Sequence, residues 1–331
     1  MPQDTAEHPY ATLQPALILD AVETTGVRCD GRLLALNSYE NRVFQVGLED
    51  AEPVVVKFYR PGRWSDEAIL EEHAFAFELD ALEIPVVPPL CGPGSASLHR
   101  FGGFRFAVFP RRGGHPPELE SPEHLQWLGR LIGRIHAVGA VRRFRHRPVL
   151  DLESFGHASR RHLLASPMLL PEMRAAWESI SAAVLERAAA AFERAGEFAR
   201  IRLHGDCHPG NILWTDHGPH FVDLDDCRSG PAMQDLWMLL SGDRESMTVQ
   251  LGHVLAGYTE FRDFDPAELH LVEALRSLRM LHHSAWLARR WDDPAFPQAF
   301  PWFGGARYWE QQVVALREQL ELMDEPPLAW H

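Results

Sequence analysis

A carboxylate and an amide lie five residues apart in one short polar segment of this chain. The segment reads His-Gly-Asp-Cys-His-Pro-Gly-Asn, which places Asp206 five positions before Asn211. This spacing is that of the catalytic loop of a phosphoryl-transfer enzyme. The carboxylate would orient and deprotonate an acceptor hydroxyl, and the amide oxygen would hold a magnesium ion against nucleotide phosphates. The segment therefore predicts a kinase-like site that uses ATP and Mg²⁺.

A second metal carboxylate, Asp223, follows shortly downstream in the sequence Phe-Val-Asp-Leu-Asp. Apolar, strand-like stretches at 201–203 and 212–214 lead into and out of the polar segment, so neighbouring strands would hold the loop. We interpret Asp206 and Asp223 as the catalytic carboxylates. Asn211 and Asp223 are the predicted Mg²⁺ ligands.

Two other interpretations of the polar segment stay open. Gly, Asp and Asn often do no more than cap turns. A zinc site is the second alternative, because histidine and thiolate are good zinc ligands, although no paired Cys-x-x-Cys spacing is present. Its candidate ligands are His204, Cys207, His208 and Cys227.

Lys57 ends an apolar run of three valines and is the candidate phosphate anchor. A fixed cation there would offset the anionic charge of the α- and β-phosphates. The helical pattern that follows carries Glu71 and Glu72, and we prefer Glu72 as the ion-pair partner of Lys57, while Glu71 stays an alternative. A solvated lysine on an edge strand is the other interpretation.

The segment 36–43, Leu-Asn-Ser-Tyr-Glu-Asn-Arg-Val, stands where a protein kinase would have a glycine-rich loop. A turn of Asn and Ser can still present backbone N–H groups and the Ser38 hydroxyl to phosphate oxygens. We therefore predict that Ser38 binds the nucleotide, with a plain hairpin turn as the alternative.

Length and composition indicate a soluble enzyme of two lobes. The chain has 331 residues, of which 46% are hydrophobic and 24% charged. No stretch approaches the roughly 20 apolar residues of a membrane span, and the amino terminus is polar and acidic without a signal core. We expect a cytoplasmic protein with no membrane partner. The four scattered cysteines fit free thiols in a reducing compartment.

The formal net charge of −14 opposes attraction to nucleic acid, because phosphate-rich partners select basic surfaces. We therefore expect no nucleic-acid partner. The same acidity would favour a cationic acceptor, either a basic protein segment or a polyamine-like small molecule. Net charge alone does not decide between them.

The pattern of elements predicts an α+β, bilobal, protein-kinase-like fold. A strand-rich N-terminal lobe, residues 1–109, would bind the nucleotide phosphates, and a mainly helical C-terminal lobe, residues 110–331, would carry the catalytic loop and the acceptor site. The first lobe combines strands with one helix, and residues 111–117 connect the lobes. Ser121 is a predicted helix N-cap and Gly139 a predicted helix stop. Strands are expected at 32–36, 43–48, 54–59 and 104–109, and helices at 66–82, 121–139, 171–195, 267–290 and 309–323.

The chain resembles the bacterial stress-response serine/threonine kinase family, within the aminoglycoside-phosphotransferase and choline-kinase group of kinase-like folds. The resemblance runs nearly end to end and is carried by segments 36–43, 55–61, 202–208, 221–226 and 293–297. It implies that Asp206 accepts the proton, that Asn211 and Asp223 bind Mg²⁺, and that Ser38 lies against ATP. It also implies a serine or threonine of a protein, including the enzyme itself, as the phosphate acceptor.

Departures from ordinary protein kinases are informative. Gly205 stands where those enzymes usually carry an arginine that pairs with a phosphorylated activation loop, and only 224–229 separate Asp223 from Gly230. We therefore expect no phosphorylation-gated loop. Asp235 could instead hold the catalytic loop by accepting its backbone N–H groups, or it could simply begin a helix.

Two rival functions use the same residues. A small-molecule kinase would phosphorylate an aminoglycoside, choline-like or homoserine-like alcohol, or a sugar with the same machinery. A nucleotide-binding pseudoenzyme is disfavoured because every expected catalytic residue is present. We expect the protein to act as a monomer.

Overall fold

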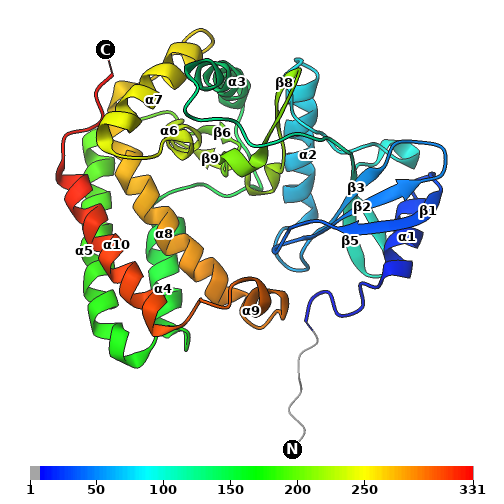
Figure 1. Cartoon of the computed structure of the whole chain (residues 1–331), viewed down its shortest axis with the longest axis horizontal. Coiled ribbons are helices and arrows are strands. Elements are labelled where there is room, and N and C mark those ends of the chain that lie inside the picture. The colour runs from blue at the N-terminus through cyan, green and yellow to red at the C-terminus, as the bar shows by residue number, and fades with distance from the viewer. Residues whose placement is uncertain (1–7, 331) are drawn as a thin grey trace, which may run out of the picture.

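The structure, a computed structural model, describes residues 8–330. It is a mixed α+β fold in which a twisted sheet lies at one end of the molecule and a group of helices at the other (Figure 1). The sheet is antiparallel with the strand order β1-β2-β3-β5-β4. Its strands are β1 Cys29–Ala35, β2 Arg42–Leu48, β3 Val54–Phe58, β4 His99–Phe101 and β5 Phe104–Pro110.

Helix α1, Pro15–Glu23, covers one face of this sheet (Figure 1). The sequence pattern predicted one helix in the first lobe, which was wrong, because α1 and α2 are both present. No side chain caps the start of the nine-residue helix, so local sequence marks it weakly. Burial of Ile18, Ala21 and Val22 against strand residues such as Val56 stabilises it instead.

Helix α2, Asp66–Asp80, lies between the sheet and the helical lobe (Figure 1). The Ser65 hydroxyl accepts the N–H of Ala68 at 3.2 Å and caps its start. Ile69, Phe75 and Leu79 are fully buried on its inner side. The helix ends two residues before the predicted limit, where Ala81 turns the chain towards Pro85.

The segment 111–117 connects the sheet to helix α3, Pro122–Val141, as predicted. His115 and Trp214 exchange backbone hydrogen bonds of 3.0 and 2.7 Å, which tie this connection to the second lobe. Ser121 caps α3 by accepting the N–H of His124 at 3.3 Å. Gly139 does not end the helix, which continues to Val141; a Cβ at Gly139 would collide with the backbone carbonyl of Arg202, so this glycine serves close packing.

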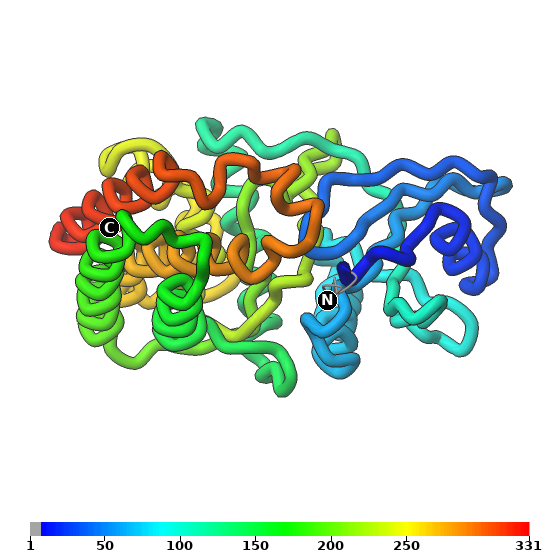
Figure 2. The backbone as a smooth tube through the Cα atoms, turned by 90° about the horizontal axis from the view of Figure 1, so that it is seen from below, coloured from blue at the N-terminus to red at the C-terminus, as the bar shows by residue number. Residues whose placement is uncertain are grey.

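The remainder of the chain is mainly helical (Figure 2). Its largest buried cluster joins α3, α5, α7, α8 and α10. The predicted helix at 267–290 is divided into a 3₁₀ segment, Pro266–Leu271, and helix α8, Val272–Arg289. The other helices are α4 Ala158–Ala165, α5 Pro171–Ala195, α6 Met233–Leu236, α7 Arg244–Tyr258, α9 Ala295–Ala299 and α10 Ala306–Asp324. Within residues 8–330, no helix combines the length and apolarity needed to cross a bilayer.

Two short antiparallel strand pairs lie beside the helices and frame the polar loops. Strand β6, Ile201–Leu203, pairs with β9, Arg228–Gly230, and strand β7, Ile212–Thr215, pairs with β8, Gly218–Phe221. The segment 204–211 therefore runs from β6 to β7, and 222–227 runs from β8 to β9. Both polar segments emerge from strands, as predicted. The lobe boundary at residue 109 stays a prediction.

Candidate active site

Asp235, a buried residue of α6, anchors the loop that is predicted to be catalytic. Its two carboxylate oxygens accept the backbone N–H groups of His204 and Gly205, each at 2.8 Å. Gly205 has a φ of +85°, and a Cβ there would collide with the backbone carbonyl of Asp226. An arginine at this position would be strained. The loop anchor predicted for Asp235 is present.

Asp206 and Asn211 come together within this loop. The Asn211 Nδ2 group donates to the Asp206 carbonyl at 2.9 Å, which leaves the Asn211 amide oxygen available to a ligand. Burial opposes ionisation of Asp206, but His208, 3.5 Å away, and Arg279, at 2.6 Å, outweigh it and hold the pKa of Asp206 below its usual range. Asp206 is therefore a carboxylate at neutral pH, as a proton acceptor requires.

Asp223 follows β8 in the left-handed region, with φ 60° and ψ 63°. This conformation is uncommon for a non-glycine residue and is found at functional sites. The Asp223 side chain is 53% exposed, and one of its oxygens lies 3.0 Å from Lys57 Nζ. The second oxygen is available to a metal ion, so the backbone turn aims this carboxylate into the cleft.

Lys57 lies on the central strand β3, not on an edge, and is buried. Its Nζ lies 3.2 Å from Glu72 Oε1, so the preferred partner is the one that pairs with it. Glu71 instead accepts backbone N–H groups of residues 145–147. Burial lowers the pKa of Lys57, but Asp223 and Glu72 outweigh this effect and raise it well above the ordinary value. Lys57 is therefore a permanent cation directly behind Asp223.

The donor set of the loops suits a magnesium ion. Asn211 and Asp223 offer an amide oxygen and a carboxylate oxygen, and Mg²⁺ prefers such hard ligands completed by water and substrate phosphate. No group of three or more His, Cys, Asp and Glu side chains that could hold a metal lies within residues 8–330. The two side chains therefore fit an ion that a nucleotide brings with it.

The alternative zinc site is not formed. The His204 ring uses both nitrogens inside the protein: Nε2 donates to the Val222 carbonyl at 2.9 Å, and Nδ1 accepts the Asp206 N–H at 3.4 Å. Cys207 and Cys227 are buried free cysteines. Burial raises the pKa of Cys207 well above the ordinary thiol value and that of Cys227 to about 12. These thiols are protonated and weakly nucleophilic at neutral pH.

The loop between β1 and β2 reaches the second lobe. Ser38 lines the cleft, and its hydroxyl donates to the Asn41 carbonyl at 3.2 Å. Tyr39 packs edge-on against Phe300, with 4.8 Å between ring centroids. Glu40 pairs with Arg290, the residue that follows α8, and accepts the indole N–H of Trp286 in α8.

An aspartate of the second lobe makes further contacts with the first lobe. Asp293 pairs with Arg42 and with Arg60, both at 2.9 Å. Three segments that carried the family resemblance, 36–43, 55–61 and 293–297, therefore meet at one interface between the lobes. This contact holds the loop that bears Ser38 over the cleft.

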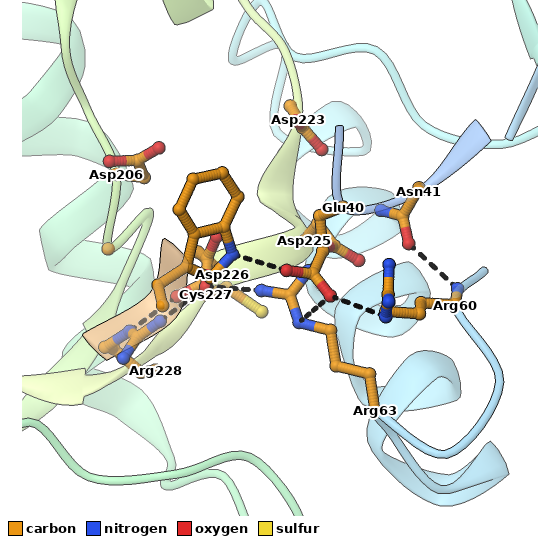
Figure 3. A network of polar contacts seen from close by, with 12 residues as sticks. Glu40, Asn41, Arg60, Arg63, Asp206, Asp223, Asp225, Asp226, Cys227 and Arg228 are labelled. Atoms are coloured by element: carbon orange, nitrogen blue, oxygen red, sulfur yellow. Dashed lines mark hydrogen bonds and ion pairs between the residues drawn. The ribbon is translucent and has the colours of Figure 1, made fainter. Parts of the chain in front are cut away.

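Arginines that the sequence analysis missed support the acidic segment after Asp223 (Figure 3). Arg63 pairs with Asp225 and lies 2.8 Å from Asp226, and Arg228 lies 2.6 Å from Asp226. Burial opposes ionisation of Asp226, but these arginines lower the pKa of Asp226 far below its usual value. No local sequence signal marks Arg63, because its partner Asp225 lies 162 positions further along the chain.

A cleft of about 710 Å³ collects these groups. Ser38, Asp206, Asn211 and Asp223 all line it, and Lys57 lies behind Asp223. Figure 3 shows Asp206 and Asp223 on neighbouring segments, with Glu40 and Asn41 approaching from the first lobe. The structure therefore brings all six predicted site residues to one place.

Comparison with known proteins agrees with this arrangement. The model of the family described as "Phosphotransferase enzyme family" matches residues 32–272. This chain belongs to the phosphotransferase enzyme family. Relatives include stress response kinase A of Escherichia coli strain K12, which is 45% identical over 96% of both chains, and serine/threonine protein kinase RdoA of Salmonella typhimurium LT2, which is 44% identical over the same shares.

Solved structures share the fold of this chain. A microcompartment-associated aminopropanol kinase has a TM-score of 0.70 at 16% identity, with 93% of this chain and 96% of that chain covered. An amicoumacin kinase in complex with AMP-PNP, Ca²⁺ and Ami has a TM-score of 0.68 at 17% identity, with 91% and 90% covered. At these identities the likeness establishes the fold alone. The predicted α+β kinase-like fold and family are confirmed.

Proposed function

We propose that this phosphotransferase is an ATP- and Mg²⁺-dependent serine/threonine protein kinase. One observation carries the proposal: Asp206, Asn211 and Asp223 face one cleft, beside a lysine that is already paired with Glu72. A base, two metal ligands and a fixed cation in this order are the parts that phosphoryl transfer from ATP requires.

In the proposed reaction, the acceptor oxygen bonds to the γ-phosphorus of ATP as the bond to the ADP oxygen breaks, and Asp206 takes the hydroxyl proton. Asn211 and Asp223 would hold the metal. A bound Mg²⁺ would neutralise phosphate charge. Lys57 would position the α- and β-phosphates, and the loop bearing Ser38 would cover them. Asp235 keeps the base in place through the loop backbone.

The protein acceptor is supported by relatives. The name of the Salmonella relative is serine/threonine protein kinase, and the Escherichia coli relatives are named for a stress response. Alignment over 96% of both chains includes both lobes and therefore the acceptor side of the cleft. We extend both properties, a Ser/Thr acceptor and a role in stress, to this chain.

A small hydroxyl compound is the second candidate acceptor. The cleft volume of about 710 Å³ falls within the range of small-molecule sites. The contacts of Glu40 with Trp286 and Arg290 narrow access to the cleft for a folded partner. The aminopropanol and amicoumacin kinases have the same fold. Such an acceptor would use the same base and metal ligands.

The test is incubation with Mg²⁺ and labelled ATP, followed by residue-level mass spectrometry, in parallel with a panel of small alcohols. Phosphoserine or phosphothreonine on the enzyme or on a test protein is expected. Asp223→Ala should weaken both Mg²⁺-nucleotide binding and turnover, because it removes a metal ligand. Transfer to small alcohols alone would select the second candidate, and unaltered Mg²⁺ dependence in Asp223→Ala would contradict the metal assignment.

We further propose that the enzyme acts as a cytoplasmic monomer. Every named group that lines the cleft comes from one chain, so the proposed catalysis does not need a second copy of the protein. Four free cysteines are compatible with a reducing compartment. Sedimentation at catalytic concentrations should give the mass of one chain, 37.5 kDa. Activity confined to a heavier species would contradict this.

A further inference from the structure

One face of helix α8 lines the cleft next to the catalytic carboxylate. Its cleft residues recur every three or four positions, so they share one side of the helix. This face is basic and aromatic, unlike the acidic chain as a whole. Its members are Arg279, His282, His283, Trp286 and Arg289, and Arg290 follows directly at the end of the helix.

Arg279 is the member closest to the chemistry. Its guanidinium lies 2.6 Å from Asp206 Oδ1, and its side chain is 34% exposed. Within residues 8–330, Asp206 supplies the one carboxylate at ion-pair distance from Arg279. A second negative group entering the cleft could therefore compete for this arginine directly.

The other carboxylates around the cleft already have cationic partners. Asp223 pairs with Lys57, Asp226 with Arg228, and Glu40 with Arg290. Arg289, by contrast, has no carboxylate at ion-pair distance in the part of the chain that the structure describes. The charge that α8 leaves open to an acceptor is therefore positive.

The two histidines of this face add no positive charge and do not change their charge near neutral pH. Burial and the nearby arginines lower the pKa of His282 to about 3 and that of His283 to about 4. Both rings are neutral at physiological pH. They stack on Phe155 and Trp286, respectively, and so form walls of the cleft around the arginines.

We propose that the acceptor is anionic, a serine or threonine flanked by Asp or Glu, and that Arg279 binds the flanking carboxylate and releases Asp206 to accept the hydroxyl proton. The inference rests on the proposed kinase function and names its substrate class. It opposes the expectation from net charge, because a cation 2.6 Å from Asp206 acts on an acceptor there more strongly than screened charges elsewhere on the surface.

Arginine suits this exchange. Its guanidinium can bind a carboxylate through two parallel N–H···O bonds, and moving from Asp206 to a substrate carboxylate keeps the number of charge-assisted bonds the same. A lysine-rich acceptor would meet Arg279 and Arg289 as like charges and would leave Asp206 paired. Selection therefore comes from attraction and repulsion together.

The experiment compares two serine peptides that differ only in their flanking residues, Asp/Glu in one and Lys/Arg in the other. We measure kcat/KM for each in the wild type, Arg279→Gln, Arg279→Lys and the control Arg317→Gln, which changes an exposed arginine of α10. The readout is the kcat/KM for the acidic peptide divided by that for the basic peptide, because a general loss of activity cancels in this ratio.

The wild type should prefer the acidic peptide by about tenfold or more, since close charge pairs commonly have effects of this size. Arg279→Gln should bring the ratio close to one, Arg279→Lys should restore part of it, and Arg317→Gln should keep the wild-type ratio. A wild-type preference for the basic peptide, or an unchanged ratio in Arg279→Gln, would overturn the inference and leave the kinase function intact.

A second arm separates this inference from the proposed function. Glycerate, a carboxylated alcohol, and ethanolamine, an aminated one, are offered under the same conditions. Transfer to glycerate alone, with no peptide product, would refute the protein acceptor but retain the anionic class. Transfer to ethanolamine alone would overturn both. Absence of nucleotide binding and of any transfer would refute the kinase function, from which the inference starts.

Discussion

The Nε2 atom of His136 lies 3.0 Å from Oδ2 of Asp235, the residue whose carboxylate also accepts the first two N–H groups of the catalytic loop. Both side chains are fully or nearly fully buried. Helix α3 thus orients the carboxylate on α6 that orients the loop. The position of Asp206, the proposed base, therefore depends on a buried chain of contacts from His136 through Asp235 to the loop.

Asp235→Asn should loosen the loop. The substitution replaces one acceptor oxygen with an NH₂ group that faces a backbone N–H, so we expect a loss of about 2 to 4 kcal/mol in the free energy of unfolding and a fall in turnover of about tenfold or more. Urea denaturation and steady-state kinetics measure the two effects. Asp216→Asn, in the exposed turn between β7 and β8, is the matched control and should change neither.

Asp206→Asn should abolish most turnover while nucleotide binding survives. The variant keeps the shape of the side chain but removes the proton acceptor, so kcat should fall by about two or more orders of magnitude. Nucleotide affinity, measured by calorimetry with Mg²⁺, should be nearly unchanged. Turnover at the wild-type rate would show that another group accepts the proton.

Unphosphorylated enzyme should be active from the first turnover. The chain from Asp223 to β9 consists of residues 224–227, a single helical turn, and Gly205 replaces the arginine that a phosphorylated loop would need. We would measure the initial rate of phosphatase-treated protein against ATP-preincubated protein. Equal rates are expected, whereas a lag that preincubation removes would indicate activation by phosphorylation.

Peroxide should leave activity nearly unchanged. Cys207 follows Asp206, the proposed base, but is buried, and burial and the nearby Asp235 and Asp206 raise the pKa of its thiol. Exposed Cys91 serves as the internal control for reagent access. Mass spectrometry should find Cys91 oxidised and Cys207 intact; a reversible loss of activity that Cys207→Ser abolishes would reveal redox control.

Glu268 should make stability depend on pH. Burial raises its pKa to about 7 from the ordinary 4.5, and its Oε2 accepts the Met233 N–H at 2.8 Å. Because the folded-state pKa is the higher one, the folded protein takes up this proton first. The stabilisation is therefore complete below about pH 4.5 and is lost as the pH rises through 7.

Glu268→Gln cannot titrate and should remove this dependence. Relative to the wild type, the variant should gain on the order of 2 kcal/mol in the free energy of unfolding between pH 5 and pH 8. Urea denaturation at intervals across this range measures it. Glu310→Gln, an exposed residue of α10, should follow the wild type at every pH. Parallel curves for Glu268→Gln and the wild type would contradict the assignment.

The sequence alone was enough to predict the candidate site and most of the elements. The spacing from Asp206 to Asn211 reflects one short loop between two strands, and such local relationships survive in a linear pattern. Asp223, Lys57 and Ser38 could likewise be placed by their flanking strands. Helix α3 could be capped correctly at Ser121 because the cap is made by its own first turn.

Only the tertiary structure decided what depends on distant neighbours. The partner of Lys57 was Glu72 and not the adjacent Glu71. Consecutive side chains of an α-helix point about 100° apart, and only packing fixes which of the two faces β3. Helix α1 formed because a sheet was there to bury it. The positive side of the cleft at Arg279 contradicts the sign of the net charge, because electrostatic interactions at an active site are governed by the few charges within several ångströms and not by the sum over the chain.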